Sequence, residues 1–336
     1  MTRRPGWLAL LAGLLAASVA GCADDEEPSN ADLRGVRLAA VIKALDNPFF
    51  VTMRQGLVAT ARREDARLRV AAAPTGLQDT AGQASELESL AAGHPRCYVV
   101  NPINETNLVG ALARVADETP IVNVDSVVGE DAAKALGVQI TTYVGSDNHA
   151  GGMLGADAMA ALVGRGARVV VITGIPGDVG SGLRAGGFTE GNRGRFDVVA
   201  TIAADFEREK ARRAAADLLS EDPGIDGFFA VNDLMALGAA DAVQAAGKDG
   251  DVRVVGFDGI PEALRAIRRG SMSATIAQYP YTMGQLSIEA CLAALRGEPV
   301  PATVDAPVQI VSTENIARAQ ANFPKPVEQF DDPFTR

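Results

Sequence analysis

The sequence contains few residues of the kinds that hold metals, build disulfide frameworks or bind polyanions. Of its 336 residues only three are cysteines and two are histidines, His94 and His149, with no Cys/His cluster around them. This excludes a small disulfide-stapled scaffold and gives no zinc-binding pattern. Lys and Arg number 31 against 42 Asp and Glu, a formal net charge of −11. An acidic chain of this kind argues against nucleic acid and against an anionic membrane surface as partners.

The N-terminus has an apolar run, residues 7–15, that is too short by about five residues to cross a bilayer as a helix. Arg3 and Arg4 precede it, and Val19-Ala20-Gly21-Cys22 follows it. A basic start, a short apolar core and small residues indicate a secretory signal peptide over 1–21. The last four residues resemble the bacterial lipobox, so Cys22 is predicted to be the lipidated first residue of the mature chain. The alternative is a plain secretory signal with a chance cysteine.

The rest of the chain is therefore expected in the periplasm or at the cell surface. Residues 22–32 are acidic and polar, and too poor in apolar side chains to fold, so they predict a tether between the lipid and the body. About 300 residues remain, enough for roughly two domains, and 47% hydrophobic content lets both bury a core. Cys97 and Cys291 each lie in an apolar setting, which favours two buried free thiols over a disulfide.

Past the tether, short β-branched runs alternate with Ala-rich amphipathic stretches. This alternation predicts strands at 37–42, 68–73, 97–101, 121–124, 143–145, 169–173, 198–203, 227–231, 252–256 and 274–277. It predicts helices between them at 48–63, 80–92, 105–117, 148–163, 207–219, 234–246, 261–268 and 282–295. Strands and helices at this spacing form parallel sheets covered by helices on both faces. Ten strands are too many for one six-stranded unit, so we expect an α/β fold of two similar lobes.

In open α/β sheets, ligands bind beyond the carboxyl ends of the strands. The residues expected there are carboxylates, amides and aromatics, with few cations. Carboxylates and amides hydrogen-bond neutral hydroxyls, and aromatic faces stack on the C–H faces of a sugar ring. Taken singly, Asn47 or Asn232 is more simply a helix cap, and any one Phe is more simply core. Their recurrence at the same topological place in both halves favours a ligand cleft.

These residues also carry a family resemblance. Five motifs occur in order, at 47–50 (Asn-Pro-Phe-Phe), 204–206 (Ala-Asp-Phe), 229–239, 254–259 and 274–278. They resemble the ribose-binding-protein group of type I periplasmic binding proteins, and the match runs from about Gly35 to Val311. The resemblance implies two Rossmann-like lobes joined by three crossing segments, near 146–147, 278–279 and 305–306. It divides the chain into an N-terminal lobe (33–146 plus 279–305) and a C-terminal lobe with the tail (147–278 plus 306–336).

The resemblance also implies the site. The ligand-binding residues carried over from it are Lys43, Asn47, Phe49, Phe50, Asp125, Ser126, Asp178, Arg184, Phe206, Asn232, Phe257, Asp258 and Gln278. Phe49 or Phe50 and Phe206 would sandwich a sugar ring, and no cofactor or metal is expected. Ribose binders have arginines where this chain has Ser126 and Gly182. Two bidentate hydroxyl clamps are thus absent, which points to a bulkier or differently hydroxylated sugar or a polyol rather than ribose.

The expected function is capture of a neutral monosaccharide or cyclitol by lobe closure and delivery to the permease of an ABC importer, by a monomer that performs no chemistry. A sensor that presents a sugar or autoinducer to a receptor kinase or chemoreceptor is the alternative. A lac-type repressor, which shares the fold, needs a DNA-binding segment where this chain has a secretion signal. A glycosidase could use Asp125 and Asp258 as its carboxylate pair, but a pocket that closes around a whole monosaccharide leaves no exit for an aglycone.

Overall fold

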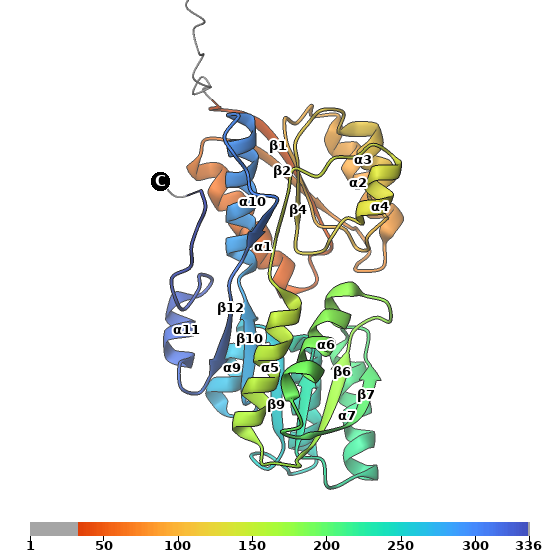
Figure 1. Cartoon of the computed structure of the whole chain (residues 1–336), viewed down its shortest axis with the longest axis vertical. Coiled ribbons are helices and arrows are strands. Elements are labelled where there is room, and N and C mark those ends of the chain that lie inside the picture. Colours follow the sequence, from red (N-terminus) through yellow and green to blue (C-terminus); the bar gives the residue numbers. More distant parts are fainter. Residues whose placement is uncertain (1–32, 335–336) are drawn as a thin grey trace, which may run out of the picture.

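The computed structural model describes residues 33–334, which fold into two lobes, each built on a six-stranded sheet (Figure 1). The signal peptide (1–21), the lipidated Cys22 and the tether (22–32) predicted from the sequence lie outside the described residues. In residues 33–334 no helix is long and apolar enough to cross a membrane.

The sheet of the first lobe is parallel throughout, with strand order β11-β5-β4-β3-β1-β2. Its strands are β1 (Arg37–Ile42), β2 (Arg67–Ala72), β3 (Tyr98–Val100), β4 (Ile121–Val124), β5 (Thr142–Gly145) and β11 (Thr303–Asp305). β1, β3 and β4 are nearly continuous apolar runs with almost every residue buried. Such runs are typical of parallel strands that are covered by helices on both faces.

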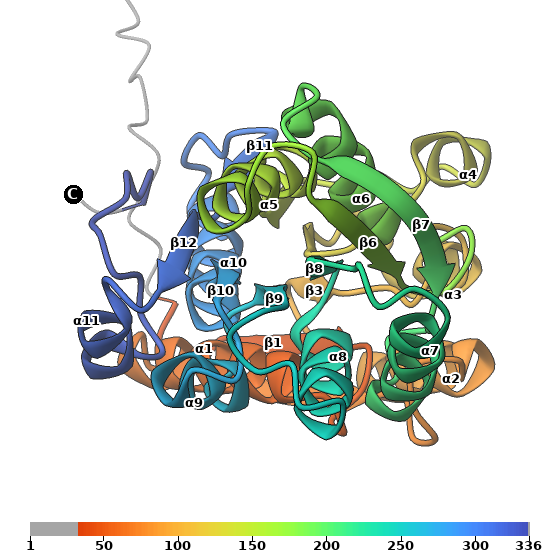
Figure 2. The same cartoon turned by 90° about the horizontal axis from the view of Figure 1, so that it is seen from below.

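The sheet of the second lobe has the order β12-β10-β9-β8-β6-β7, in which only β12 runs antiparallel to its neighbour. Its strands are β6 (Arg168–Thr173), β7 (Asp197–Ala203), β8 (Gly227–Ala230), β9 (Arg253–Asp258), β10 (Ala274–Gln278) and β12 (Val308–Ser312). Seen from below, α5 and α6 cover one face of this sheet, and α7, α8 and α9 cover the other (Figure 2).

The helices follow the strands in the expected alternation. They are α1 (Pro48–Arg63), α2 (Thr80–Ala91), α3 (Val109–Val115), α4 (Glu130–Ala135), α5 (Asn148–Leu162), α6 (Val179–Asn192), α7 (Arg208–Glu221), α8 (Asp233–Ala245), α9 (Pro261–Arg269), α10 (Pro280–Leu295) and α11 (Ile316–Asn322). All ten predicted strands are present, so the prediction of an α/β fold of two parallel-sheet lobes is confirmed. β11 and β12 were not predicted; both are edge strands close to Pro301 and Pro307, and proline within a run weakens a strand signal.

The chain passes between the two sheets three times: from β5 to α5, from β10 to α10, and from β11 to β12. After the second passage α10 returns to the first lobe and packs closely against α1. A Cβ on Gly56 of α1 would lie 2.0 Å from the carbonyl oxygen of Tyr281, and one on Gly284 of α10 would lie 2.5 Å from that of Met53. Only glycine permits this approach, which fixes the start of α10 beside the first lobe.

One prediction about the cysteines is wrong. Cys97 and Cys291 form a disulfide, with Cα atoms 5.8 Å apart and a sequence separation of 194. Both side chains are fully buried, as expected, but α10 lies across the sheet of the first lobe, so that Cys291 meets the residue preceding β3. The local sequences around the two cysteines could not predict that they are neighbours, because they come together only when α10 packs on the sheet.

Candidate functional site

A cleft of about 840 Å³ lies between the lobes, where strands of both sheets end. This is within the range of roughly 300–1,000 Å³ that ligand pockets occupy. Of the thirteen predicted site residues, eleven line it: Lys43, Asn47, Phe49, Phe50, Asp125, Ser126, Asp178, Arg184, Phe206, Asn232 and Asp258. Residues separated by up to about 200 positions in the chain thus meet on one surface.

The other two predicted residues, Phe257 and Gln278, do not line this cleft. β9 extends two residues further than predicted, so Phe257 lies within the strand and its ring is fully buried, 4.1 Å beneath the guanidinium carbon of Arg184. Gln278 ends β10, and its Nε2 donates to Asp258 Oδ1 at 2.9 Å. Gly182, the other position where the resemblance implies a missing arginine, is not among the lining residues, but a Cβ there would meet nothing within 4 Å.

Three of the lining residues are also helix caps. Asn47 Oδ1 accepts from Phe49 N at 2.9 Å, Asp178 Oδ1 from Ser181 N at 2.7 Å, and Asn232 Oδ1 from Met235 N at 2.9 Å. The capping alternative and the cleft prediction are therefore compatible at these positions. Because the cap occupies Oδ1 of Asn47 and Asn232, each asparagine keeps its amide nitrogen as a donor for the cleft.

Asp125 lines the cleft on the side of the first lobe. Its Oδ2 accepts from Asn101 Nδ2 at 3.0 Å and from Ser126 Oγ at 3.3 Å, while Tyr143 Oη donates to its backbone oxygen at 2.6 Å. Burial and the charge of Asp125 raise the pKa of Tyr143, which keeps this hydroxyl a donor. One carboxylate oxygen of Asp125 thus retains its full capacity to accept hydrogen bonds.

Asp258 and Arg184 line the cleft on the side of the second lobe. Arg184 Nη1 donates to Asp258 Oδ1 at 3.2 Å and to the Val231 carbonyl at 2.9 Å, and its Nε donates to Asn148 Oδ1 at 2.7 Å. Burial raises the pKa of Asp258 to about 6, although Arg184 and Gln278 favour its ionised form; the charge of Asp125 across the cleft raises it further. The second oxygen of Asp258 takes no part in these bonds.

Behind Asp258 lies a second carboxyl, Asp233, which is fully buried. It accepts from Gly259 N at 2.7 Å, from Ile260 N at 2.9 Å and from Thr275 Oγ1 at 2.7 Å. Burial, and then the charge of Asp258, raise the pKa of Asp233 well above its usual range. Because Asp233 binds the backbone directly after Asp258, it fixes the end of β9 and aims Asp258 into the cleft.

Backbone strain is concentrated on this cleft. Eight non-glycine residues in 33–334 have positive φ, and four of them line it: Asp125 (63°), Asp205 (55°), Phe206 (63°) and Asp258 (123°). A bulky residue in this region is an outlier, and such residues persist at functional sites where the surrounding structure holds them. The Phe206 ring lies against Gly174, where a Cβ would be 2.2 Å from its Cζ, so glycine makes room for the ring.

The aromatic and charged lining sets the ligand chemistry. Phe49 and Phe50 meet edge to face with centroids 5.2 Å apart, and Lys43 Nζ lies 5.9 Å from the Phe50 centroid. The charged residues of the cleft wall are six carboxylates against two cations: Glu105, Asp125, Asp147, Asp178, Asp205 and Asp258, with Lys43 and Arg184. An anionic ligand would therefore meet net repulsion here.

Three residues outside the prediction support the site. Asn101 holds Asp125, Tyr143 holds the backbone of Asp125, and Asn148 orients Arg184. Asn101 could have been found, because it is a polar residue at the end of a predicted strand. Tyr143 and Asn148 carry no such signal, since their roles depend on which strands and helices become neighbours.

The model of the periplasmic binding protein domain matches residues 38–299. The chain is 32% identical to the ribose import binding protein of Bacillus subtilis, over 84% of this chain and 90% of that protein. It is 34% identical to the D-allose-binding periplasmic protein of Escherichia coli, over 75% of this chain and 82% of that protein.

Solved structures agree with this match. A periplasmic solute-binding protein of Actinobacillus succinogenes with bound D-allose superposes with a TM-score of 0.79 at 32% identity, over 84% of this chain and 99% of that one. A carbohydrate transporter solute-binding protein of Agrobacterium radiobacter in complex with D-arabinose superposes with a TM-score of 0.76 at 27% identity, over 85% and 98%. The chain belongs to the periplasmic binding protein family, with the type I fold.

Proposed function

We propose that the protein captures a neutral monosaccharide or polyol between its lobes and delivers it to an ABC importer, without performing chemistry on it. The observation that carries this proposal is the pair of carboxylates from opposite lobes, Asp125 and Asp258, each with an oxygen left to accept from ligand hydroxyls. Asn47 and Asn232 add donors from the two lobes. A ring with hydroxyls on both edges satisfies all four.

The excess of carboxylates over cations on the cleft wall favours a neutral ligand over a sugar acid or sugar phosphate. The phenyl rings of Phe49, Phe50 and Phe206 supply apolar faces for the C–H faces of a sugar. Because polar groups come from both lobes, ligand binding stabilises a closed arrangement over others. The hinge then consists of the three crossings, and the lobes comprise 33–146 with 279–305 and 147–278 with 306–336.

The relatives named for ribose and allose support a neutral sugar as the ligand. We infer that ribose is not the preferred one, and this rests on Ser126. It lies on the cleft wall beside Asp125, where the family resemblance leads us to expect an arginine in ribose binders. A serine leaves more room and fewer donors than a guanidinium, which suits a larger sugar or a cyclitol.

We further propose that the protein is a monomeric lipoprotein, anchored outside the cytoplasm through Cys22 and released from its signal peptide before that residue. Its partner would be the permease of an ABC importer in the same membrane system. The relatives named as import binding proteins favour import over signalling to a kinase or chemoreceptor.

A thermal-shift screen of residues 32–336 tests the proposal. The panel contains pentoses, hexoses, cyclitols, polyols and sugar acids, with amino acids as a class control. A ligand at a thousandfold its dissociation constant adds about 4 kcal/mol of stability, or about 8–16 °C in a chain of this size. We expect the largest shift from a neutral sugar or cyclitol. Stabilisation by sugar acids alone, or by no carbohydrate, would overturn the proposal.

Replacing Ser126 with arginine is expected to move selectivity toward ribose. The guanidinium would donate in pairs to hydroxyls next to Asp125 and would fill space that a larger sugar needs. The ratio of the Kd for D-allose to the Kd for D-ribose should rise at least about tenfold, a change of about 1.4 kcal/mol. Isothermal titration with both sugars measures it. Ser126→Lys, which adds charge without the planar fork, should change the ratio less; equal effects would contradict the argument.

Sugar affinity is expected to fall as the pH decreases from 7.5 to 5. The pKa of Asp258 is raised to about 6, so the carboxylate that accepts from hydroxyls is protonated over this interval. Arg184, Asp125 and Asp233 are the charged or titratable groups that act on it. At pH 5 about nine-tenths of the protein would carry the protonated form, which weakens the apparent affinity about tenfold. Asp258→Asn should bind weakly with little pH dependence; an unchanged slope in that variant would assign the effect elsewhere.

A further inference from the structure

A small cavity of about 20 Å³ lies directly behind the binding cleft. Its inner wall includes Phe49, Asp258 and Gln278, and the first two of these also line the main cleft. Its outer wall is made by the C-terminal segment, through Pro324 and Val327 among others. The back of the candidate site is therefore covered by residues beyond Val311, where the family resemblance ends.

The C-terminal segment is bonded to the hinge. Val327 N donates to Gln309 Oε1 at 3.1 Å, and Tyr279 Oη donates to the same oxygen at 2.6 Å. Tyr279 lies in the second crossing, next to Gln278, and Gln309 follows the third crossing. Gln309 Nε2 in turn donates to the Glu328 carbonyl at 3.4 Å. One short stretch of the tail thus ties two of the three crossings together.

The same segment continues to the first lobe. It leaves α11 on the second lobe and runs along β12 toward α10 and α1 (Figure 1). Phe330 and Phe334 are partly buried against the core. Burial, and then the charge of Asp332, raise the pKa of Glu289 in α10, which places the tail beside that helix of the first lobe. The tail is therefore a fourth connection between the lobes, on the hinge side.

We propose that residues 323–327 form the rear wall of the binding site and position Gln278 and the hinge, and so set ligand affinity without touching the ligand. Tyr279 and Val327 are positioning residues in this account. Held by Gln309, Tyr279 fixes the backbone from which Gln278 donates to Asp258. The wall also separates the rear of Asp258 from bulk solvent. The part of the proposal that concerns affinity rests on the proposed function; the positioning of the hinge does not.

Hydrogen exchange measured without ligand tests the positioning directly. The variants are a chain that ends at Asn322, which removes the whole rear wall, and the substitution Tyr279→Phe, which removes only the hydroxyl. Tyr98→Phe is the matched control, because the Tyr98 hydroxyl bonds the Val115 carbonyl inside the first lobe, away from the hinge. We expect amides of residues 276–281 to exchange at least tenfold faster in the shortened chain and about fivefold faster in Tyr279→Phe. In Tyr98→Phe they should be unchanged.

A second measurement distinguishes a role in positioning the hinge from a general loss of stability. In the shortened chain water reaches Asp258 from behind, so a carboxyl NMR titration should give a lower pKa for Asp258 than in the intact chain. Affinity for D-allose should weaken three- to tenfold in the shortened chain and less in Tyr279→Phe. The proposal would be overturned if the hinge amides of the shortened chain exchange as slowly as those of the intact chain and the pKa of Asp258 is also unchanged. If these change but no neutral sugar binds the intact protein, the proposed function fails and the positioning role stands.

Discussion

Replacing Arg184 with methionine is expected to abolish measurable sugar binding and to lower the free energy of unfolding by roughly 3 kcal/mol. The guanidinium bonds Asp258, Asn148 and the Val231 carbonyl from a position that is only 9% exposed, and it stacks on Phe257. Methionine keeps the volume but leaves Asp258 without a cation. Breaking a buried pair in this way costs about 3–5 kcal/mol. The lower figure applies because the pair borders the cleft.

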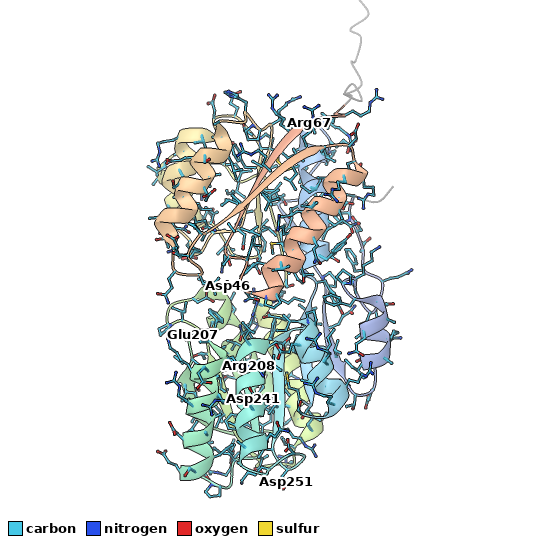
Figure 3. The ribbon with its side chains drawn as sticks, turned by 180° about the vertical axis from the view of Figure 1, so that it is seen from behind. Asp46, Arg67, Glu207, Arg208, Asp241 and Asp251 are labelled. Carbon is cyan, nitrogen blue, oxygen red and sulfur yellow. A yellow bond between two sulfur atoms is a disulfide. The ribbon has the colours of Figure 1, made fainter. Side chains whose placement is uncertain are left out.

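Arg208→Met is the matched control. Arg208 pairs with Asp241 and Glu262 on the second lobe, at 2.9 and 2.7 Å, but these side chains are more than a third exposed. Figure 3 shows Arg208 beside Asp241 on this lobe. Exposed pairs contribute about 0–1 kcal/mol. Chemical denaturation with titration of D-allose measures both effects. Equal destabilisation by the two substitutions, or sugar affinity retained in Arg184→Met, would contradict the role given to Arg184.

Removing the disulfide is expected to produce the second large effect, on stability alone. The chain-entropy model gives about 5 kcal/mol for a loop of 194 residues, and measured values are typically about 2–4 kcal/mol. Cys97→Ala with Cys291→Ala should therefore lower the free energy of unfolding by about 3 kcal/mol. Neither cysteine lines the cleft, so the Kd for D-allose should change by less than about twofold.

Denaturant unfolding with and without reductant measures this effect. The parent chain, with residues 1–31 removed, should show no free thiol when denatured without reductant and should lose stability when reductant is added. The double variant should be insensitive to reductant. Two titratable thiols in the denatured parent chain, or a difference below about 0.5 kcal/mol between the proteins, would contradict the disulfide.

Most of the fold could be predicted because the ends of helices and strands depend on residues close together in the sequence. β1 and α1 begin and end where apolar periodicity, the Asn47 cap and Pro48 predict. β11 and β12 could not be predicted, since their pairing partners are brought to them by the crossings and prolines weaken their own signal. The Cys97–Cys291 bond was missed for the same reason: its geometry depends on a helix that packs across a sheet.

Eleven of the thirteen residues predicted for the site line the cleft, but the contacts that give each its role could not be predicted. Motifs after the strands identified Asp125, Asn232 and Asp258. They could not show that Phe257 supports Arg184 from beneath, or that Asp233 fixes the backbone behind Asp258. Nor could they show that a C-terminal segment without a recognised motif covers the rear of the cleft. Each of these roles arises from contacts between distant elements.

We propose that one neutral sugar is held between the two lobes by their opposing carboxylates. A crystal structure of the protein with the strongest neutral ligand of the screen tests it most directly. We predict ring hydroxyls within hydrogen-bond distance of Asp125 and of Asp258, with a phenyl ring on at least one face of the sugar. A sugar bound to one lobe alone, or outside the cleft, would contradict the claim.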